Sequence, residues 1–326
     1  MKLAVVGAGK IVEEFLPHAY AVDGLSLAAI YGRPARREHL EQLQAQFGIE
    51  SVYVDYDEML ADARVDTVWI AVPNSLHMEF ARRALLAEKH VICEKPFVLS
   101  ESDLAELRRI ATAKSVILVE AISTLDLANY RWLREHIGDL GDLRLIQCDY
   151  SQYSSRFDAF QAGNVLPAFD ATKGGGALMD IGIYTIHFVV GLLGEPRSVS
   201  YTANIERGID TSGVLVLDYE TCTAVCVCAK DSDGPIRTKL QGTHGSFVID
   251  GAPNVMESVD VQLRGGDTDH IDPSAPAHRM VPEFMAFQRM IETLDFAERD
   301  VRLDHSQAVL SVATRALASA GIRLGG

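Results

Sequence analysis

One lysine directly follows a buried-strand pattern and could handle the proton of a hydroxyl group. The apolar run at residues 91–93 is typical of a parallel strand covered on both faces, and Glu94, Lys95 and Pro96 come immediately after it. Ligands of open α/β sheets bind beyond the carboxyl ends of such strands. The pattern therefore predicts that the Lys95 ammonium lies where chemistry takes place. A solvated pair of loop charges is the alternative interpretation.

Three titratable side chains recur along an apolar helix in the second half of the chain. Three glycines at residues 174–176 open this segment, and Asp180, Tyr184 and His187 follow at positions i, i+4 and i+7. This spacing places them on one stripe of a helix with 3.6 residues per turn. A buried carboxylate needs a partner, and we expect a lysine entering the same cleft to supply it. A structural hydrogen-bond network is the alternative.

The N-terminal segment has the pattern of a dinucleotide-binding unit. A short apolar strand leads into Gly7 and Gly9, and a helix over residues 11–22 and a strand over residues 25–31 are expected to follow. Gly7 permits a tight turn, and Gly9 lets backbone amides approach a pyrophosphate at the start of the helix. The third glycine position of this fingerprint holds Val12, which weakens the motif taken alone.

The end of the second predicted strand favours NADP(H) over NAD(H). An acidic residue at this position binds the ribose 2′-hydroxyl of NAD, whereas an arginine accommodates the 2′-phosphate of NADP. This chain has Arg33, followed by Arg36 and Arg37, and its next acidic residue comes only after them. We therefore expect Arg33 and Arg37 to contact the cofactor. Simple exposure in the first turn of a helix would also explain these arginines.

Strand and helix patterns alternate up to about residue 120. Further strands are expected over residues 66–72 and 116–119, with one helix ending near residue 88 and another over residues 100–113. This alternation predicts a parallel, doubly wound sheet with its ligand site along one edge. The other residues expected to contact the cofactor along that edge are Lys10, Ile11, Ala71, Pro73, Asn74, His77, Glu94 and Lys95.

The second half has a different pattern, in which strand-like stretches follow one another with little helix between them. They lie at residues 143–150, 199–204, 213–219, 223–229, 236–241 and 245–249. A loop is expected over residues 267–276 and helices over residues 282–298 and 305–324. The predicted fold is therefore α/β, with a Rossmann domain over residues 1–120 and an α+β domain over residues 121–326. The second domain should contain a large, open and mostly antiparallel sheet.

The composition excludes several classes of partner. The chain has 326 residues, 48% of them hydrophobic and 23% charged, which is typical of a globular protein with two domains. Its net charge of −15 argues against nucleic-acid and anionic-membrane partners, because both bind basic surfaces. We see no apolar span of 18 residues and expect no membrane segment. The first residues also lack the pattern of a signal peptide.

Five cysteines in no regular framework indicate a reduced, cytoplasmic protein. Cys222, Cys226 and Cys228 lie close together in a strand-like stretch, where the last two would share one face. They are most simply interpreted as small buried hydrophobic residues. No paired CxxC and no nearby HxxxH completes a metal site, so no metal is expected.

Taken together, these motifs resemble the Gfo/Idh/MocA family of nicotinamide-dependent oxidoreductases, named after glucose-fructose oxidoreductase and inositol dehydrogenase. The resemblance spans nearly the whole chain, and its motifs follow in order at family-like spacing. They are the N-terminal glycine turn, Pro73-Asn74-x-x-His77, Glu94-Lys95-Pro96 and the segment at residues 174–187. The resemblance implies a Rossmann domain followed by an α/β domain whose open sheet often serves oligomerisation, as a homodimer or homotetramer.

The family resemblance also implies roles for individual residues. Lys95 would bind the substrate hydroxyl and help move its proton, and Asp180 would orient the substrate and the catalytic partner. Pro96 would have the family's cis-proline role and fix Lys95 beside the nicotinamide. Many sugar and inositol enzymes of the family have histidine four residues after the aspartate, where this chain has Tyr184. The proton carrier therefore stays open between Tyr184 and His187.

The implied activity is hydride transfer between nicotinamide and a secondary alcohol or carbonyl of a sugar, cyclitol or related polyol, with NADP(H) favoured as the cofactor. Two alternatives stay open: an NAD-dependent glycosidase on the same fold, and a non-catalytic NADP(H)-binding sensor. Substrate specificity is expected in second-domain loops around residues 150–170, where Tyr153, Arg156 and Asp158 could face a substrate.

Overall fold

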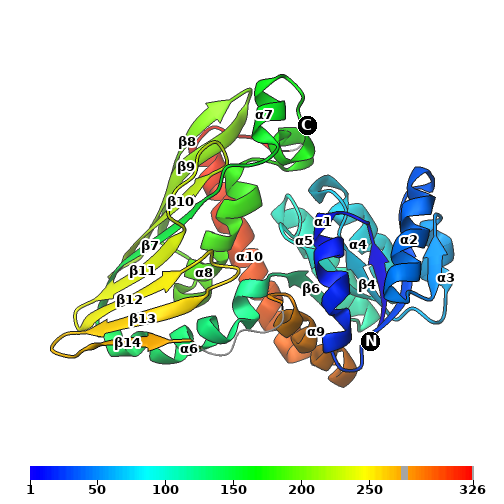
Figure 1. Cartoon of the computed structure of the whole chain (residues 1–326), viewed down its shortest axis with the longest axis horizontal. Helices are drawn as coiled ribbons and strands as arrows, with labels where there is room; N and C mark the ends of the chain where they lie inside the picture. The colour runs from blue at the N-terminus through cyan, green and yellow to red at the C-terminus, as the bar shows by residue number, and fades with distance from the viewer. Residues whose placement is uncertain (273–277, 325–326) are drawn as a thin grey trace. The chain divides into compact units, whose positions relative to one another are not determined.

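The computed structural model describes residues 1–272 and 278–324, and it divides into two compact units. The first unit contains the chain up to Ala121, together with helix α9 (Val281–Thr293) and the part of α10 (Phe296–Ser319) that ends at Asp304. The second unit begins at Ile122 and includes the rest of α10. Figure 1 shows the elements of each unit. The domain predicted over residues 121–326 therefore differs from the second unit, because α9 and the start of α10 belong to the first unit.

The first unit is built on a parallel six-stranded sheet in the order β3-β2-β1-β4-β5-β6. Its strands are β1 (Lys2–Val6), β2 (Ser26–Tyr31), β3 (Ser51–Tyr53), β4 (Thr67–Ile70), β5 (His90–Glu94) and β6 (Leu118–Ala121). Its connecting helices are α1 (Lys10–Phe15), α2 (Arg37–Phe47), α3 (Tyr56–Ala61), α4 (His77–Leu86) and α5 (Glu101–Lys114), with 3-10 turns at η1 (Leu16–Ala21), η2 (Pro34–Arg36) and η3 (Asn74–Leu76). The strand order reverses between β1 and β4, which is where such sheets bind their ligands. The predicted Rossmann sheet is confirmed.

An aromatic cluster explains why α9 belongs to the first unit. The ring of Phe15 in α1 stacks on Phe284 of α9 with centroids 4.0 Å apart, and Trp69 of β4 meets Phe284 edge-on at 5.1 Å. All three side chains are fully buried, and loss of one such ring typically costs about 3–5 kcal/mol. The sequence predicted a helix over residues 282–298 but could not show which sheet this helix covers.

Local chemistry explains where two helices of this unit begin and end. The single helix expected over residues 11–22 stops at Phe15 and continues as the 3-10 turn η1, because Pro17 has no N–H and its ring crowds the preceding turn. Helix α5 starts where it was predicted. The Ser100 hydroxyl accepts a hydrogen bond from the Asp103 N–H at 3.1 Å, which satisfies one of the unpaired donors of the first turn.

The second unit contains an eight-stranded sheet in the order β14-β13-β12-β11-β7-β10-β9-β8, in which only the β7–β10 pair is parallel. Its strands are β7 (Leu143–Ser151), β8 (Ser198–Glu206), β9 (Ile209–Asp218), β10 (Thr223–Ala229), β11 (Arg237–Gly242), β12 (Gly245–Asp250), β13 (Ser258–Leu263) and β14 (Thr268–Ile271). Its other elements are α6 (Ala128–His136), α7 (Phe157–Gln161), α8 (Ile183–Leu193), η4 (Ser123–Asp126), η5 (Ile137–Leu140), η6 (Pro167–Phe169), η7 (Ala171–Lys173) and the π turn η8 (Leu178–Gly182). The mostly antiparallel sheet is confirmed. The loop predicted over residues 267–276 is wrong at β14, a polar edge strand without an apolar alternation, while residues 273–276 lie outside the described chain.

Helices α8 and α10 run along one face of this sheet (Figure 1). The strands alternate accordingly. On β10, Cys226 and Cys228 are buried on the covered face, as predicted, and all five cysteines are free thiols. On the opposite face, Leu145, Val214 and Val216 are more than a third exposed. The second unit therefore has one packed face and one apolar face that no element of the described chain covers.

The helical segment Ala171–Leu193 corrects one expectation from the sequence. By length and composition it is apolar enough to cross a membrane, although no span of this kind was expected. Its most apolar window is 72% buried within the chain, and Ile186, Phe188 and Val189 of α8 are fully buried. The hydrophobicity of this segment is therefore explained by packing against the sheet of the second unit.

Candidate active site

The two glycines of the N-terminal turn have different structural roles. Gly7 has a φ of +115°, and a Cβ at this position would overlap the Ala71 carbonyl oxygen. The Gly7 N–H donates to the Tyr31 carbonyl at 2.9 Å, so the turn is wedged between the ends of β2 and β4. Gly9 has an ordinary φ of −95°, and a Cβ there would meet nothing within 4 Å. The open space at Gly9 fits the close approach of a pyrophosphate to the backbone.

The residues predicted to bind the cofactor follow the carboxyl ends of neighbouring strands. Arg33 comes after β2, Gly7 after β1, Asn74 after β4 and Lys95 after β5, and these four strands are consecutive in the sheet. Neighbouring strands lie about 4.8 Å apart, so the four positions span an edge of roughly 14 Å. An extended dinucleotide fits along an edge of this length.

The arginines after β2 differ in their contacts. All three are exposed. Arg37 forms an ion pair with Glu41 one helical turn further on, with 3.3 Å between nitrogen and oxygen. Within residues 1–272 and 278–324, Arg33 and Arg36 form no ion pair. Of the two predicted contacts, Arg33 is therefore better placed to bind a phosphate than Arg37.

Two other predicted cofactor residues, Lys10 and Ile11, lie at the start of α1. The Lys10 ammonium is exposed and lies 3.7 Å from the Glu14 carboxylate. The Ile11 side chain is half-buried and packs against the core of the first unit.

His77, which was predicted to contact the cofactor, is buried beneath the two loops that follow β4 and β5. Its side chain is fully buried, so it cannot present a donor to a cofactor at the sheet edge. Its Nε2 lies 2.9 Å from the Val72 carbonyl, and its Nδ1 lies 3.0 Å from that of Pro96 and 3.2 Å from that of Phe97. Burial lowers the pKa of His77. The ring thus lies between carbonyls of the loop after β4 and the loop after β5, and in its neutral form it donates to one of these two loops.

The loop that carries Lys95 is held from a second side as well. The Phe97 N–H donates to the buried Glu120 carboxylate of β6 at 3.0 Å. The Lys95–Pro96 peptide bond is cis, as expected from the family resemblance. Lys95 itself is half-buried at the end of β5. Its backbone position is therefore fixed by neighbours on both adjoining strands, which is what a residue of precise function requires.

Glu94, which directly precedes Lys95, has a raised pKa. Its Oε1 accepts a hydrogen bond from the Trp69 indole N–H at 3.1 Å. Burial raises the pKa of Glu94 from 4.5 to about 7, against the opposing effects of the Lys95 ammonium and the Trp69 N–H. A carboxyl group with such a pKa changes its charge near neutral pH, directly beside the predicted catalytic lysine.

This raised pKa predicts a pH-dependent stability. Because folding favours the protonated Glu94, its contribution is complete below about pH 4.5 and is lost as the pH rises through about 7. We expect the free energy of unfolding of the wild type, relative to Glu94→Gln, to fall by up to about 3 kcal/mol between about pH 5 and 8. Urea unfolding at several pH values measures this, with the exposed Glu38→Gln as the control. Parallel pH profiles for wild type and Glu94→Gln would contradict the prediction.

In the second unit, a buried aspartate fixes the start of the helix that carries Asp180. Asp210 of β9 accepts hydrogen bonds from the Leu178 N–H at 2.7 Å and from the Tyr201 hydroxyl at 2.8 Å. Gly176 has a φ of +107°, and a Cβ there would overlap the Asp210 carboxylate. The glycine run is therefore needed for the approach of this carboxylate to the first turn of the helix.

The three titratable residues of this helix are not equivalent. Asp180 lies in the π turn η8, so the straight 3.6-residue repeat assumed from the sequence does not hold there, and its side chain is 34% exposed. Tyr184 is 7% exposed, and its ring lies 6.0 Å from that of Tyr150. His187 is fully buried, with its Nδ1 2.9 Å from the Nε2 of His305. Accessibility thus decreases from Asp180 through Tyr184 to His187.

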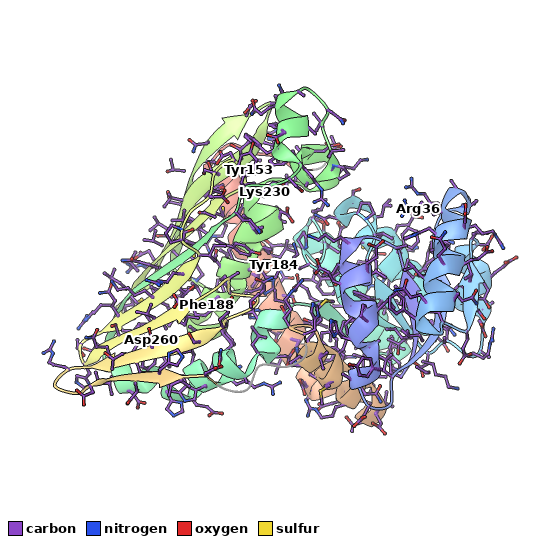
Figure 2. All side chains as sticks on the ribbon, in the orientation of Figure 1. Arg36, Tyr153, Tyr184, Phe188, Lys230 and Asp260 are labelled. Carbon is purple, nitrogen blue, oxygen red and sulfur yellow. The ribbon has the colours of Figure 1, made fainter. Side chains whose placement is uncertain are left out.

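The structure gives Asp180 a lysine partner that the sequence analysis did not identify. The Lys230 ammonium, which directly follows β10, lies 2.7 Å from the Asp180 carboxylate. Figure 2 shows Lys230 and Tyr184 in the second unit. The sequence carries the same pattern for Lys230 as for Lys95, because each lysine comes immediately after a strand with buried apolar residues.

The proposed specificity loop is folded on itself through polar contacts. The Tyr153 hydroxyl donates to the Asp158 carboxylate at 2.6 Å, and the Tyr153 N–H donates to Asp233 at 2.8 Å. Arg156 is exposed. Tyr153 and Asp158 are therefore held in fixed positions on the surface of the second unit.

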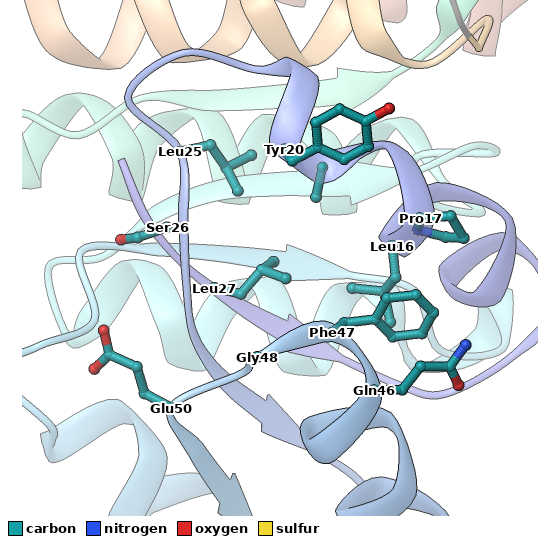
Figure 3. Close-up of a pocket in the computed structure, with 11 residues that line it drawn as sticks. Leu16, Pro17, Tyr20, Leu25, Ser26, Leu27, Gln46, Phe47, Gly48 and Glu50 are labelled. Atoms are coloured by element: carbon teal, nitrogen blue, oxygen red, sulfur yellow. The ribbon is translucent and has the colours of Figure 1, made fainter.

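A cavity of about 660 Å³ lies in the first unit (Figure 3). It is lined by η1, the start of β2 and the end of α2, with Leu27, Phe47 and Glu50 among its residues. Because the sheet is parallel, this cavity lies at the amino-terminal end of its strands, whereas Gly7 follows a carboxyl end. It is therefore separate from the predicted nucleotide edge.

Comparison with known proteins agrees with this geometry. A family model described as an oxidoreductase family with an NAD-binding Rossmann fold matches residues 1–121, and a model of the Gfo/Idh/MocA C-terminal domain matches residues 130–248. KijD10, a 3-ketoreductase from Actinomadura kijaniata solved with TDP-benzene and NADP, superposes with a TM-score of 0.83 over 98% of this chain and 97% of its own. Its sequence identity is 21%, so this likeness shows the fold.

Two curated relatives add sequence evidence over long alignments. The scyllo-inositol 2-dehydrogenase (NADP(+)) IolU of Bacillus subtilis is 32% identical over 99% of this chain and 98% of its own length. The trans-1,2-dihydrobenzene-1,2-diol dehydrogenase of Mus musculus is 27% identical over 76% of this chain and 74% of its own length. The chain thus belongs to the Gfo/Idh/MocA family of NAD(P)-dependent oxidoreductases.

Proposed function

We propose that this protein is an NADP(H)-preferring dehydrogenase or reductase that interconverts a secondary alcohol and a carbonyl on a cyclitol or sugar-like polyol. The observation that carries the proposal is the order of Arg33, Gly7 and Lys95 along one carboxyl edge of the parallel sheet. The near full-length likeness to a scyllo-inositol 2-dehydrogenase makes inositols the first substrates to test.

The first unit supplies the residues that would hold the cofactor. Gly7 and Gly9 leave room for the pyrophosphate, Arg33 would bind the 2′-phosphate, and the loop after β4 would border the nicotinamide half. A bound nicotinamide supplies or accepts the hydride. Asn74 lies in the turn η3 of that loop. The buried His77 ring contacts the same loop at the Val72 carbonyl and thereby helps to fix its position.

The proton of the substrate hydroxyl is handled by Lys95, Asp180 and Tyr184. Lys95 binds the hydroxyl and stabilises negative charge on its oxygen during hydride transfer. Tyr184 rather than His187 is the proton carrier in this proposal, because the tyrosine is partly accessible whereas the histidine is fully buried beside His305. Asp180 orients both the substrate and Tyr184.

Cofactor preference can be tested at Arg33. We expect Arg33→Ala to raise the Kd for NADPH by about 10- to 100-fold, because a charge-assisted hydrogen bond to the 2′-phosphate contributes about 1.5–3 kcal/mol. The Kd for NADH should change by less than about two-fold. Fluorescence titration with both nucleotides measures the two constants. Arg82→Ala, an exposed arginine that pairs with Glu106 at 2.8 Å, is the control. Equal weakening of NADH and NADPH would exclude a role for Arg33 in the preference.

The reaction itself is tested by a substrate panel. Purified protein is incubated with NADP+ and scyllo-inositol, myo-inositol and common aldoses, and with NADPH and the corresponding keto compounds. Net formation or loss of NADPH absorbance supports the proposal. Hydrolysis of a nitrophenyl glycoside without any net change in that absorbance would identify a glycosidase instead. Tight NADPH binding without any turnover would favour a sensor.

The uncovered face of the second sheet supports a homo-oligomer, either a dimer or a tetramer. Val216 of β9 lies directly opposite Val225 of β10, and Val214 lies opposite Val227, so the apolar side chains form a continuous patch. Light scattering of the purified protein tests this assembly. A cytoplasmic location is part of the same proposal, since all five cysteines are free.

A further inference from the structure

Lys230 is one of the most deeply buried charges of the second unit. Its side chain is 3% exposed, and its ammonium lies 2.7 Å from the Asp180 carboxylate. The same ammonium donates to the Ala168 carbonyl at 2.8 Å and lies 4.2 Å from the centroid of the Phe169 ring. One buried cation thus contacts both the helix of Asp180 and the turn η6.

The backbone of Lys230 is fixed independently of its side chain. Its N–H donates to the Thr211 carbonyl at 2.8 Å, and its carbonyl accepts from the Ser154 N–H at 2.9 Å. The turn η6 is anchored too, because Phe169 stacks on Phe160 with centroids 4.9 Å apart in a small apolar cluster. The Lys230 side chain therefore extends to Asp180 from a backbone that two hydrogen bonds hold in place.

The energetics of such a pair favour a role in geometry over a role in stability. Removing an ammonium from water costs several kcal/mol, so a buried ion pair contributes little to folding compared with a well-packed apolar residue. The pair instead determines the orientation of the Asp180 carboxylate. Asp180 is one-third exposed, and its contact with the Lys230 ammonium restricts the rotation of its carboxylate.

We propose that Lys230 is a positioning residue that fixes the orientation of the Asp180 carboxylate and couples it to the turn η6. This inference rests on the proposed function, in which Asp180 orients the substrate. The Lys230 side chain is only 3% exposed, so in this proposal it acts on the substrate through Asp180. The same ammonium thus contacts the Asp180 carboxylate and the turn η6, which ends the proposed specificity loop.

Other titratable groups surround this pair within the second unit. Tyr184 lies on the same helix as Asp180, and Asp210 lies on β9. Burial raises the pKa of Asp210, against the opposing charge of Lys230. Asp231 is next to Lys230 in the chain and accepts hydrogen bonds from Thr211 and Ser212. A shift in the pH profile of a Lys230 variant therefore has to be compared with the pH profile of a variant in which another lysine carries the same substitution.

The test compares Lys230→Gln and Lys230→Arg with the exposed control Lys173→Gln. Glutamine keeps an N–H donor for Ala168 but removes the charge. We expect Lys230→Gln to bind NADPH within about two-fold of wild type and to lower kcat for polyol oxidation by about 10- to 100-fold, as a misaligned catalytic group does. The acidic limb of its pH–kcat/KM profile should move to higher pH, because an ionised carboxylate loses its opposite charge.

Lys230→Arg keeps the charge but changes its shape. It should retain the acidic limb of the wild type and still lower kcat several-fold. If Lys230→Gln does not fold, Lys230→Arg decides: a lowered kcat with normal melting supports positioning, and an unchanged kcat overturns it. A folded Lys230→Gln with wild-type kcat and pH profile would also overturn the inference. The control Lys173→Gln should match the wild type throughout.

A second measurement separates this inference from the proposed function. If the wild type turns over no polyol, the proposed function fails, and thermal unfolding of Lys230→Gln, Asp180→Asn and the double variant then tests the pair. The double variant should lose no more melting temperature than the worse single variant, because both changes break the same contact. Additive losses would show that Lys230 does not act through Asp180.

Discussion

Lys95→Met will lower kcat for polyol oxidation by about 10²- to 10⁴-fold, the usual contribution of a group that assists proton transfer. NADPH should still bind within a few-fold of wild type, because the glycine turn and Arg33 lie on other strands. Methionine retains the length and apolar stem of lysine, and His77 and Glu120 hold the loop through backbone groups of its neighbours. The loss should therefore be chemical and not structural.

The measurement is steady-state kinetics combined with NADPH fluorescence titration and thermal melting. Lys114→Met is the matched control, since Lys114 ends α5 before the amino-terminal end of β6 and pairs with Glu88 at 2.9 Å. It should change neither kcat nor cofactor affinity. A Lys95→Met variant with near-normal kcat would remove Lys95 from the catalytic assignment.

Gly7→Ala and Gly9→Ala should fail in opposite ways. At Gly7 an alanine would require a φ of +115° and would overlap the Ala71 carbonyl oxygen, which is backbone at the end of β4 and cannot move aside cheaply. We expect a loss of several kcal/mol in the free energy of unfolding, or failure to fold. The cost falls on the protein itself, with or without cofactor.

At Gly9 the backbone is ordinary and the space is open, so alanine should change the free energy of unfolding by less than about 1 kcal/mol. NADPH affinity should nevertheless fall by about ten-fold or more, because the new methyl group occupies the space needed by the pyrophosphate. Urea unfolding and fluorescence titration separate the two effects. A Gly9→Ala variant with unchanged affinity would show that the pyrophosphate does not approach this turn.

Several features were predictable because they depend on neighbours in the sequence. The glycine turn, the strand that ends at Glu94 and the N-cap at Ser100 are all set by a few consecutive residues. The order of the elements also distinguished the parallel sheet of the first half from the antiparallel sheet of the second, because strands that alternate with helices predict a parallel sheet and strands that follow one another predict an antiparallel one. Edge elements such as β14 were missed because polar edge strands have no such pattern.

The structure places the predicted site residues in different surroundings, which the sequence could indicate only in part. Lys95 could be singled out because its place after an apolar strand is a local fact. His77 shares a motif with residues of the nucleotide loop, but its ring points inward to carbonyls of two separate loops. Sequence spacing cannot show this, because the direction of a side chain depends on what packs around it.

By itself, the sequence determined the two kinds of sheet, the nucleotide turn and the positions of Lys95, Asp180 and Tyr184 along the chain. Only the tertiary structure decided that α9 packs on the first unit, that a π turn carries Asp180 and that Lys230 is the partner of this carboxylate. Local sequence patterns indicate which face of a segment is exposed to water and which face packs into a core. Asp180 and Lys230 are far apart in the sequence and come into contact only through tertiary packing. Their pairing therefore cannot be inferred from the residues next to either of them.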